Sequence, residues 1–203
     1  MADGGDLILA SGSRFRRAML ERVGIKFRVV AAAVDEDALK AAMLDDDPDL
    51  EAALVAEKLA CAKAEQVSRA HPGALVIGAD QVLVCGGEFF SKPPTIEAAR
   101  EQLLALRGLT HALPTAVVLA RAGEIVWRHV DEPQMSMRAF SDAFLDAYLA
   151  AEGQILCETV GAYQFEGRGA QLFEAIEGDQ FSIVGLPLLP LLGALRAQAV
   201  ILS

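Results

Sequence analysis

Short apolar runs alternate along this chain with stretches whose apolar residues recur every three or four positions. The first run, Leu7–Ala10, predicts a buried strand. In the helix predicted for 14–23, apolar side chains recur at helical spacing: Phe15, Ala18, Met19 and Val23. Gly24 then suits the position just after a helix end. The chain therefore opens with a strand that leads directly into a helix.

The same pattern continues as alternating strands and helices. Further strands are predicted at 27–31, 74–77, 82–84, 112–120 and 125–130. Helices are predicted at 48–69, 95–107 and 141–151, and from about 187, with Asp47, Thr95 and Ser141 as N-caps. An acidic segment at 35–37 and a loop through 45–47 separate the second strand from the second helix. Gly86 and Gly87 favour a hairpin turn. This order indicates the α/β class with a mixed sheet.

Composition narrows the range of functions. The chain has 203 residues, of which 53% are hydrophobic and 23% charged, enough for one domain or two lobes with a buried core. Lysine and arginine number 18 against 28 aspartate and glutamate residues, so the net charge is −10. That balance argues against general binding to nucleic acid or to an anionic membrane. An acidic protein can still hold an anion if its few cations converge on one site.

No membrane or secretory signal is visible. Neither a run of about 18 apolar residues nor a positively charged leader is present. The cysteines, Cys61, Cys85 and Cys157, lack the CxxC spacing, so we expect free thiols in a reducing cytoplasm. The three histidines form no zinc-binding pattern.

Ser11-Gly12-Ser13 is the first segment with candidate chemistry. It links the first predicted strand to the first predicted helix, and Arg16 and Arg17 follow in the first turn. Unpaired N–H groups at a helix start attract anions, and arginine side chains match phosphate oxygens. The alternative is an ordinary serine N-cap beside solvated arginines, and the segment alone does not decide between them.

Three later segments could also take part in a site. Asp80 follows a buried apolar run, at the end of a strand where open α/β sheets bind ligands. Lys92 lies in a loop stiffened by the prolines after it, and the glycines between 161 and 169 permit close approach to a ligand. Each has a plain alternative: a turn aspartate, a solvated lysine and a structural turn.

Taken together and in this order, these segments resemble the Maf family of nucleoside triphosphate pyrophosphatases. The matching stretches are LILASGSRFRR from Leu7, VDE at 34–36, LACAKA at 59–64, IGADQ at 77–81, SKP at 91–93, Gly108 with His111, GAYQFEG at 161–167 and IEGDQFSIVGLPL at 176–188. The resemblance implies one Maf-like domain over 1–203 with its core at 6–195. It also implies an inosine-triphosphatase-like mixed sheet flanked by helices, with two lobes around a central cleft.

The resemblance further implies a reaction. Members of the family hydrolyse a nucleoside triphosphate between its α- and β-phosphates, with a divalent metal ion such as Mg²⁺ or Mn²⁺. By position, Asp80 matches the catalytic proton acceptor, and Glu36 and Asp80 match the metal site. The phosphate-binding positions are Ser11, Arg16, Lys63 and Lys92. A homodimer is expected on the same ground, whereas the net charge of −10 is the reason to expect no nucleic-acid or membrane partner.

Three positions in the family vary with base preference, and here they are Phe15, Gln81 and Glu166. This set is closer to the type that favours 7-methyl-GTP than to the type that favours dTTP and UTP. An aromatic face and a carboxylate would both stabilise the positive charge of an N7-methylated guanine. Thr159 and Ser91 depart from the usual family residues. The alternatives are a dTTP- or UTP-preferring enzyme, a hydrolase of deaminated purines such as ITP, and a non-hydrolysing nucleotide-binding regulator of division.

Overall fold

The chain forms two compact units. A computed structural model describes residues 6–202. The first unit combines the chain up to 81, residues 115–131 and the chain from 185 onward, and the second combines 82–114 with 132–184. Each unit therefore draws on segments that are far apart in the sequence, and each is described below by itself.

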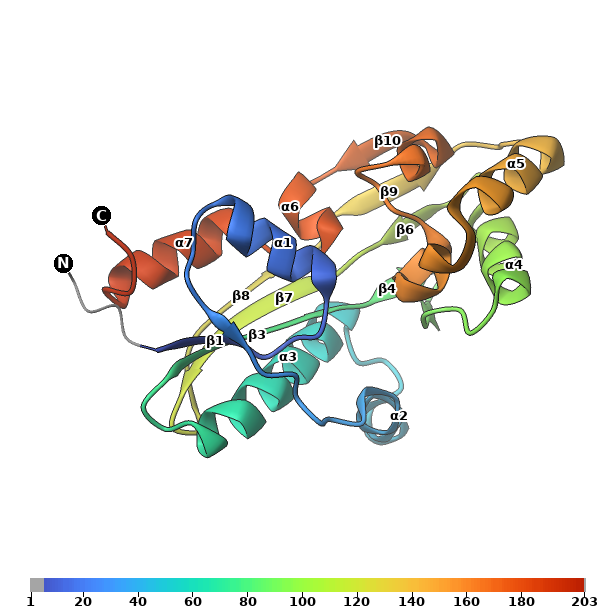
Figure 1. The fold of residues 1–203 in the computed structure, drawn as a ribbon. Helices are drawn as coiled ribbons and strands as arrows, with labels where there is room; N and C mark the ends of the chain where they lie inside the picture. The colour runs from blue at the N-terminus through green and yellow to red at the C-terminus, as the bar shows by residue number, and fades with distance from the viewer. Residues whose placement is uncertain (1–5, 203) are drawn as a thin grey trace. The chain divides into compact units, whose positions relative to one another are not determined.

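The first unit is built on a five-stranded mixed sheet (Figure 1). Its strand order is β2 (Arg28–Val29), β1 (Leu7–Leu9), β3 (Leu75–Gln81), β7 (Thr115–Arg121) and β8 (Glu124–Asp131). β1 runs parallel to both β2 and β3, whereas β7 runs antiparallel to β3 and β8. The mixed α/β architecture expected from the sequence is thus confirmed.

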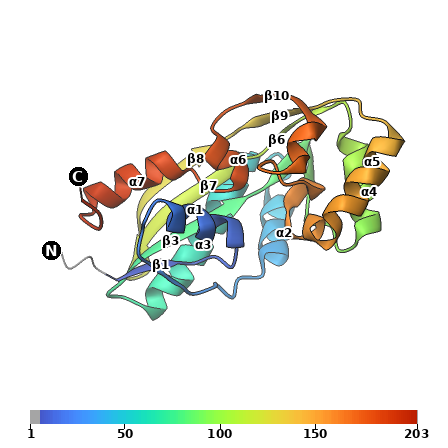
Figure 2. The same ribbon diagram turned by 45° about the horizontal axis from the view of Figure 1, so that its top comes forward.

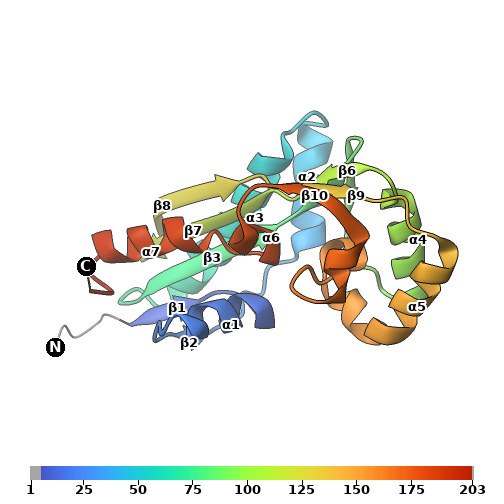
Figure 3. The same ribbon diagram turned by 90° about the horizontal axis from the view of Figure 1, so that it is seen from above.

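Helices cover both faces of this sheet. The four helices of the unit are α1 (Arg14–Arg22), α2 (Glu36–Asp46), α3 (Ala52–Ala70) and α7 (Leu188–Ala197). α3 packs on β3, β7 and β8, and α7 contacts β8. Seen from above, α3 lies on one side of the strands while α1 and α7 lie on the other (Figure 3). The sheet therefore has helices on both of its faces.

Gly78 lets α3 approach the sheet closely. A Cβ at this position of β3 would lie 2.4 Å from the Ala60 carbonyl oxygen and 2.7 Å from the Ala64 Cβ, both on α3. Such distances are shorter than any real Cβ contact, so no larger residue fits without moving the helix. The close packing brings α3 side chains within reach of the end of β3.

The second unit has a five-stranded antiparallel sheet in the order β10, β9, β6, β4, β5. These strands are β4 (Leu83–Cys85), β5 (Glu88–Phe90), β6 (Thr110–Ala112), β9 (Gln134–Met137) and β10 (Phe173–Glu177). The helices are α4 (Ile96–Leu106), α5 (Asp142–Glu152) and the short α6 (Gln180–Val184), with 3-10 turns at Gly153–Glu158, Val160–Ala162 and Arg168–Leu172. Figure 2 shows α4 beside α5. Buried core residues come from sheet and helices alike: Leu83, Leu103, Leu106, Met135, Met137 and Leu145.

Several local predictions are confirmed. The Thr95 hydroxyl accepts from the Ala98 N–H at 3.2 Å and caps α4, and the Ser141 hydroxyl caps α5 in the same way. Gly86 and Gly87, with φ of +59° and +86°, form the turn between β4 and β5. The run predicted as one strand at 112–120 is instead divided between β6 and β7, because Pro114 has no N–H to continue a ladder.

Two predictions around α2 and α3 are wrong. The acidic segment and loop predicted for 35–47 contain helix α2, whose start is capped by the Asp35 carboxylate accepting from the Ala38 N–H at 3.0 Å. α2 buries no residue, so no apolar stripe marks it in the sequence. The following helix begins at Ala52 rather than Pro48, because the Asp47 carboxylate accepts from the Asp49 N–H within a turn instead of capping a helix.

Two general expectations can be compared with the described residues. Cys61, Cys85 and Cys157 are all free thiols, as predicted. No helix within residues 6–202 is both long and apolar enough to cross a membrane.

His111, in β6 of the second unit, is a buried histidine with an unusual environment. Its side chain is 1% exposed, and its Nε2 lies 2.7 Å from the Tyr163 hydroxyl. Within the described chain, Nδ1 has no hydrogen-bond partner. The rings of Tyr163 and Phe173 pack beside it. Burial among aromatic rings lowers the pKa of His111 to about 4, since the charged ring would lose its hydration.

This histidine should make the protein less stable in acid. Its pKa is lower in the folded chain than in the unfolded chain, so its neutral form contributes fully above about pH 6.5 and that contribution is lost as the pH falls toward 4. The expected loss in unfolding free energy between pH 7 and pH 4 is about 3 kcal/mol. The loss measured by urea denaturation should be greater in the wild type than in His111→Gln by about this amount. Parallel pH profiles for the two proteins would refute the assignment.

Candidate functional site

The parallel pairing of β1 and β3 brings two distant segments together. Leu9 of β1 pairs with Ile77 of β3, and the Ala10 N–H donates to the Ile77 carbonyl at 2.8 Å. Because parallel strands end at the same edge of a sheet, Ser11 follows β1 at the edge where Asp80 lies near the end of β3. Asp80 is the sixth residue of β3 rather than a residue beyond it. The serine-rich turn and the aspartate predicted from the sequence thus lie at one edge of one sheet.

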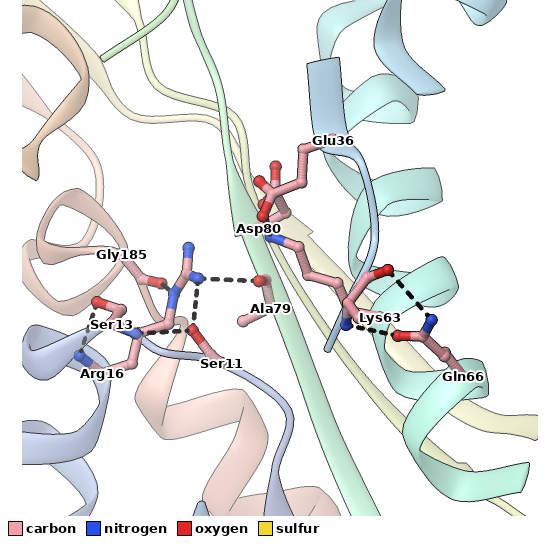
Figure 4. A network of polar contacts seen from close by, with 10 residues as sticks. Ser11, Ser13, Arg16, Glu36, Lys63, Gln66, Ala79, Asp80 and Gly185 are labelled. Atoms are coloured by element: carbon pink, nitrogen blue, oxygen red, sulfur yellow. Dashed lines mark hydrogen bonds and ion pairs between the residues drawn. The ribbon is translucent and has the colours of Figure 1, made fainter. Parts of the chain in front are cut away.

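Arg16 is held at this edge by three acceptors (Figure 4). Its Nε donates to the Gly185 carbonyl at 2.7 Å, and its Nη1 donates to the Ser11 hydroxyl at 3.1 Å and the Ala79 carbonyl at 2.9 Å. Its Nη2 makes no hydrogen bond to another residue within 6–202. Arg16 is only 9% exposed. The guanidinium is therefore fixed in orientation, with one nitrogen left to donate to a ligand.

The helix that carries Arg16 starts in the way predicted. The Ser13 hydroxyl accepts from the Arg16 N–H at 3.4 Å and so caps α1, while the Ser13 N–H donates to the Ser11 hydroxyl at 3.3 Å. Ser13 is thus an ordinary N-cap, whereas Ser11 is a buried side chain that contacts Arg16. The two serines that looked alike in the sequence have different positions.

Gly185 is a site residue that sequence reasoning did not single out. Its φ of +117° lies in a region that residues with side chains rarely adopt. A Cβ built there would lie 3.7 Å from Arg16 Nε and 3.8 Å from Gln81 Oε1, so the backbone runs directly against both side chains. The only signal was its place in the quoted stretch IVGLPL, which does not reveal that its carbonyl accepts from Arg16.

On the other face of β3, Lys63 of α3 joins two carboxylates. Its Nζ lies 2.5 Å from Asp80 Oδ1 and 2.8 Å from Glu36 Oε1 (Figure 4). The side chains of Lys63 and Asp80 are 8% and 6% exposed, whereas that of Glu36 is 52% exposed. Asp80 points to the α3 face because it lies two residues beyond Gly78 on the same strand. One ammonium group thus pairs with both a buried and a half-exposed carboxylate.

Opposing effects set the protonation of this cluster. Burial raises the pKa of Asp80 above its usual value, and the positive charges of Lys63 and Arg16 partly counter that rise. Burial also lowers the pKa of Arg16, which the nearby Asp80 and Glu36 oppose. Arg16 lies close to Asp80, because its Nη1 donates to the carbonyl of the preceding residue, Ala79. Asp80 is therefore a stronger base than an ordinary solvent-exposed aspartate.

The donor set fits a divalent cation that also binds phosphate. Among residues 6–202, no group of three or more His, Cys, Asp or Glu side chains gathers into a complete metal cage. Glu36 and Asp80 offer two carboxylates to one shared cation, Lys63 Nζ. Mg²⁺ is commonly held by one or two carboxylates together with substrate phosphates and water. The pair is thus suited to a metal ion that a phosphate ligand helps to hold.

Two of the three base-preference residues lie in the same unit. Phe15 of α1 is partly buried, and the Arg14 guanidinium lies 4.8 Å from the centre of its ring. The Gln81 Nε2 donates to the hydroxyl of Thr115, a fully buried residue on the neighbouring strand β7. Phe15 thus already attracts a cation, and Thr115, which sequence reasoning missed, orients Gln81.

Lys92 and Glu166 lie in the second unit. Lys92 is exposed in the loop between β5 and α4, before the buried Pro93. Glu166 is exposed in the turn that follows the Val160–Ala162 segment. Ser11, Phe15, Arg16, Glu36, Lys63, Asp80 and Gln81 belong to the first unit, so the structure brings seven of the nine predicted residues into one unit.

Comparison with known proteins identifies the family. A model described as Maf-like protein matches residues 6–198. The chain belongs to the Maf family. A Maf-family relative from Granulibacter bethesdensis, named nucleoside triphosphate pyrophosphatase, is 53% identical over 190 residues, 94% of this chain and 95% of its own. A relative from Mesorhizobium japonicum, named 7-methyl-GTP pyrophosphatase, is 52% identical over 195 residues, 96% of this chain and 97% of its own.

Both names recur among Maf-family relatives. A relative from Brucella abortus, named 7-methyl-GTP pyrophosphatase, is 50% identical over 192 residues, 95% of this chain and 96% of its own. The resemblance stated from the motifs is therefore confirmed over nearly the full length of the chain.

Removing Lys63 should strongly destabilise the first unit. In Lys63→Met, the buried Asp80 carboxylate loses its nearest cation, and breaking a buried ion pair from one side costs about 3–5 kcal/mol. Urea denaturation at pH 7 should show that loss. The double variant Lys63→Met/Asp80→Asn should recover most of it, because the buried side chain at position 80 is then neutral and Glu36 is half exposed.

The matched control is Arg17→Met. It breaks an exposed pair with Glu21 and should cost at most about 1 kcal/mol. If Lys63→Met loses no more stability than this control, or if the double variant is no more stable than Lys63→Met, then the Lys63–Asp80 pair does not carry the energy assigned to it.

Proposed function

We propose that this chain hydrolyses a nucleoside triphosphate between its α- and β-phosphates, releasing a nucleoside monophosphate and pyrophosphate. The observation that carries the proposal is the environment of Asp80. Its buried carboxylate pairs with the Lys63 ammonium, which also pairs with Glu36. The carbonyl of the residue before it accepts a hydrogen bond from Arg16. Maf-family relatives named pyrophosphatases, about half identical over almost the whole chain, support the same reaction.

In this proposal, Asp80 is the proton acceptor. A water molecule attacks the α-phosphorus, its proton passes to the Asp80 carboxylate, and the bond from the α-phosphorus to the bridging oxygen breaks as pyrophosphate leaves. Burial raises the pKa of Asp80, which makes it a better base than an exposed aspartate. Lys63 holds the carboxylate in place through its contact with Oδ1.

Positive charge on the protein stabilises the triphosphate. Arg16 cannot turn away, because three acceptors hold its guanidinium, and its Nη2 can donate to a phosphate oxygen. In phosphoryl transfer, most of the catalytic effect comes from such fixed charge and positioning. Ser11 takes part through its hydrogen bond with Arg16. We assign Lys92 of the second unit to the same phosphates on the basis of its motif alone.

Glu36 and Asp80 would hold the divalent metal ion. When bound, a Mg²⁺ or Mn²⁺ ion supplies positive charge that polarises the phosphate oxygens. Its binding also reconciles an acidic protein of net charge −10 with a highly anionic substrate. The requirement for a metal ion is part of the proposal.

For the base, we propose a preference for 7-methyl-GTP. Phe15 already has a guanidinium 4.8 Å from its ring centre, so its face suits a positively charged ring. Gln81, oriented by Thr115, supplies an amide, and Glu166 is assigned a carboxylate contact by position in the family. We further propose a cytoplasmic location, which the three free thiols support, and a homodimer.

Pyrophosphate release tests the reaction directly. With Mg²⁺ or Mn²⁺, the wild type should release pyrophosphate from a nucleoside triphosphate, and Asp80→Asn should lower the rate by about 10²–10⁴-fold because the proton acceptor is lost. Circular dichroism should show that the variant is folded, since Lys63 still pairs with Glu36. Near-normal turnover by Asp80→Asn would contradict the role of Asp80, and binding without turnover by the wild type would favour a regulator.

The same assay, run with 7-methyl-GTP, dTTP, UTP, CTP and ITP, tests the base preference. The highest kcat/KM is expected for 7-methyl-GTP. Equal values for all five would remove the argument from Phe15, Gln81 and Glu166 but leave the reaction class standing.

A further inference from the structure

Gln66 makes a two-point contact with a single residue outside its helix. It lies on the exposed face of α3, and its Oε1 accepts from the Ala33 N–H at 2.7 Å while its Nε2 donates to the Ala33 carbonyl at 3.3 Å (Figure 4). A side-chain amide can make this pair in one orientation only, because Ala33 offers one donor and one acceptor. Gln66 thus fixes both polar groups of Ala33.

Ala33 belongs to the segment that leads to Glu36. This segment, 30–35, joins β2 to α2 without regular secondary structure. Its start is anchored by the Val30 N–H, which donates to the Leu9 carbonyl at 3.1 Å, and its end by Asp35, which caps α2. Gln66 ties the middle of the segment to α3. Glu36, three residues after Ala33, is the first residue of α2.

Glu36 needs such support because burial does not restrict it. Its side chain is 52% exposed, yet its Oε1 lies 2.8 Å from the Lys63 Nζ. An exposed glutamate loses side-chain entropy when it is held in one conformation, so the backbone that carries it must be placed well. Lys63 and Gln66 are three residues apart on α3, so they are neighbours on the helix surface. The same helix therefore holds the Glu36 carboxylate and the backbone leading to it.

We propose that Gln66 is a positioning residue for Glu36 and acts on the reaction only through it. This inference rests on the proposed function. In this role Gln66 would bind neither the nucleotide nor the metal, since its amide is already paired with Ala33. Its amide holds Ala33 so that the Glu36 carboxylate faces Lys63 and Asp80, and with Asp80 it presents a preorganised pair to the divalent ion.

Gln66→Met tests this role, because methionine has a similar length but cannot form either hydrogen bond. We expect its kcat/KM for pyrophosphate release to fall by about fivefold to twentyfold, the effect of two lost hydrogen bonds. In a Glu36→Gln background, the same substitution should change kcat/KM by less than about twofold, since there is no Glu36 carboxylate left to place. Equal effects in the two backgrounds would overturn the proposal.

Arg69→Met is the matched control on the same helix. Arg69 lies one turn further along α3 and pairs with Glu65 at 2.8 Å, apart from Ala33 and Glu36. This variant should keep kcat/KM within about twofold of the wild type. A loss as large as that of Gln66→Met would mean that any polar change on this face of α3 disturbs the site, and the proposal would fail.

A second readout does not depend on activity. Amide hydrogen exchange in a peptide covering 30–36 should be faster in Gln66→Met than in the wild type and unchanged in Arg69→Met, because the Ala33 N–H loses its acceptor. Unchanged exchange in Gln66→Met would refute the positioning role even if the wild type is an active pyrophosphatase. A wild type without pyrophosphate release would instead refute the proposed function, whatever the exchange result.

Discussion

The ammonium group of Lys63, placed between Asp80 and Glu36, is the interaction on which the candidate site depends. Without it, Asp80 would be a buried carboxylate with its charge largely uncompensated, and a carboxyl group in that situation takes up a proton instead. With it, Asp80 can be buried and basic at once. Lys63 also draws Glu36, which the fold leaves half exposed, toward the same point.

That interaction requires α3 to lie unusually close to β3. The missing side chain at Gly78 allows the approach, because a Cβ there would overlap the Ala60 carbonyl of the helix. Gly78 and Asp80 share a face of β3. The residue that lets α3 approach is therefore followed, on the same face, by the residue that pairs with Lys63 of α3. On the opposite face, the Ala79 carbonyl and Gly185 hold Arg16. Adjacent residues of β3 therefore serve the two groups: Ala79 accepts a hydrogen bond from Arg16, and Asp80 supplies the carboxylate.

The sequence predicted those parts of the structure that depend on local chemistry. Helix caps at Thr95 and Ser141, and the hairpin turn at Gly86 and Gly87, are determined by residues that are neighbours in the chain. Helix α2 was missed because it buries nothing and is stabilised by the Asp35 cap and its acidic first turn, which a scan for apolar periodicity does not detect.

The candidate site shows the same division. Ser11, Arg16, Lys63 and Asp80 could be selected because their motifs resemble a family. Their pairing could not be read from the sequence, because Lys63 and Asp80 meet only after α3 packs on β3, and Arg16 meets Gly185 across 169 positions of the chain. A backbone carbonyl such as that of Gly185, and an amide such as that of Gln66, carry no sequence signature for the role they have. Residues that act through the backbone are thus the ones that sequence reasoning leaves out.

The most direct test of the account is to locate the bond that water forms. If hydrolysis is run in water enriched in the heavy isotope of oxygen and the products are analysed by mass spectrometry, the account predicts the label in the nucleoside monophosphate and none in the pyrophosphate, because water attacks the α-phosphorus in the proposed reaction. Label in the pyrophosphate, or release of inorganic phosphate as the first product, would contradict it.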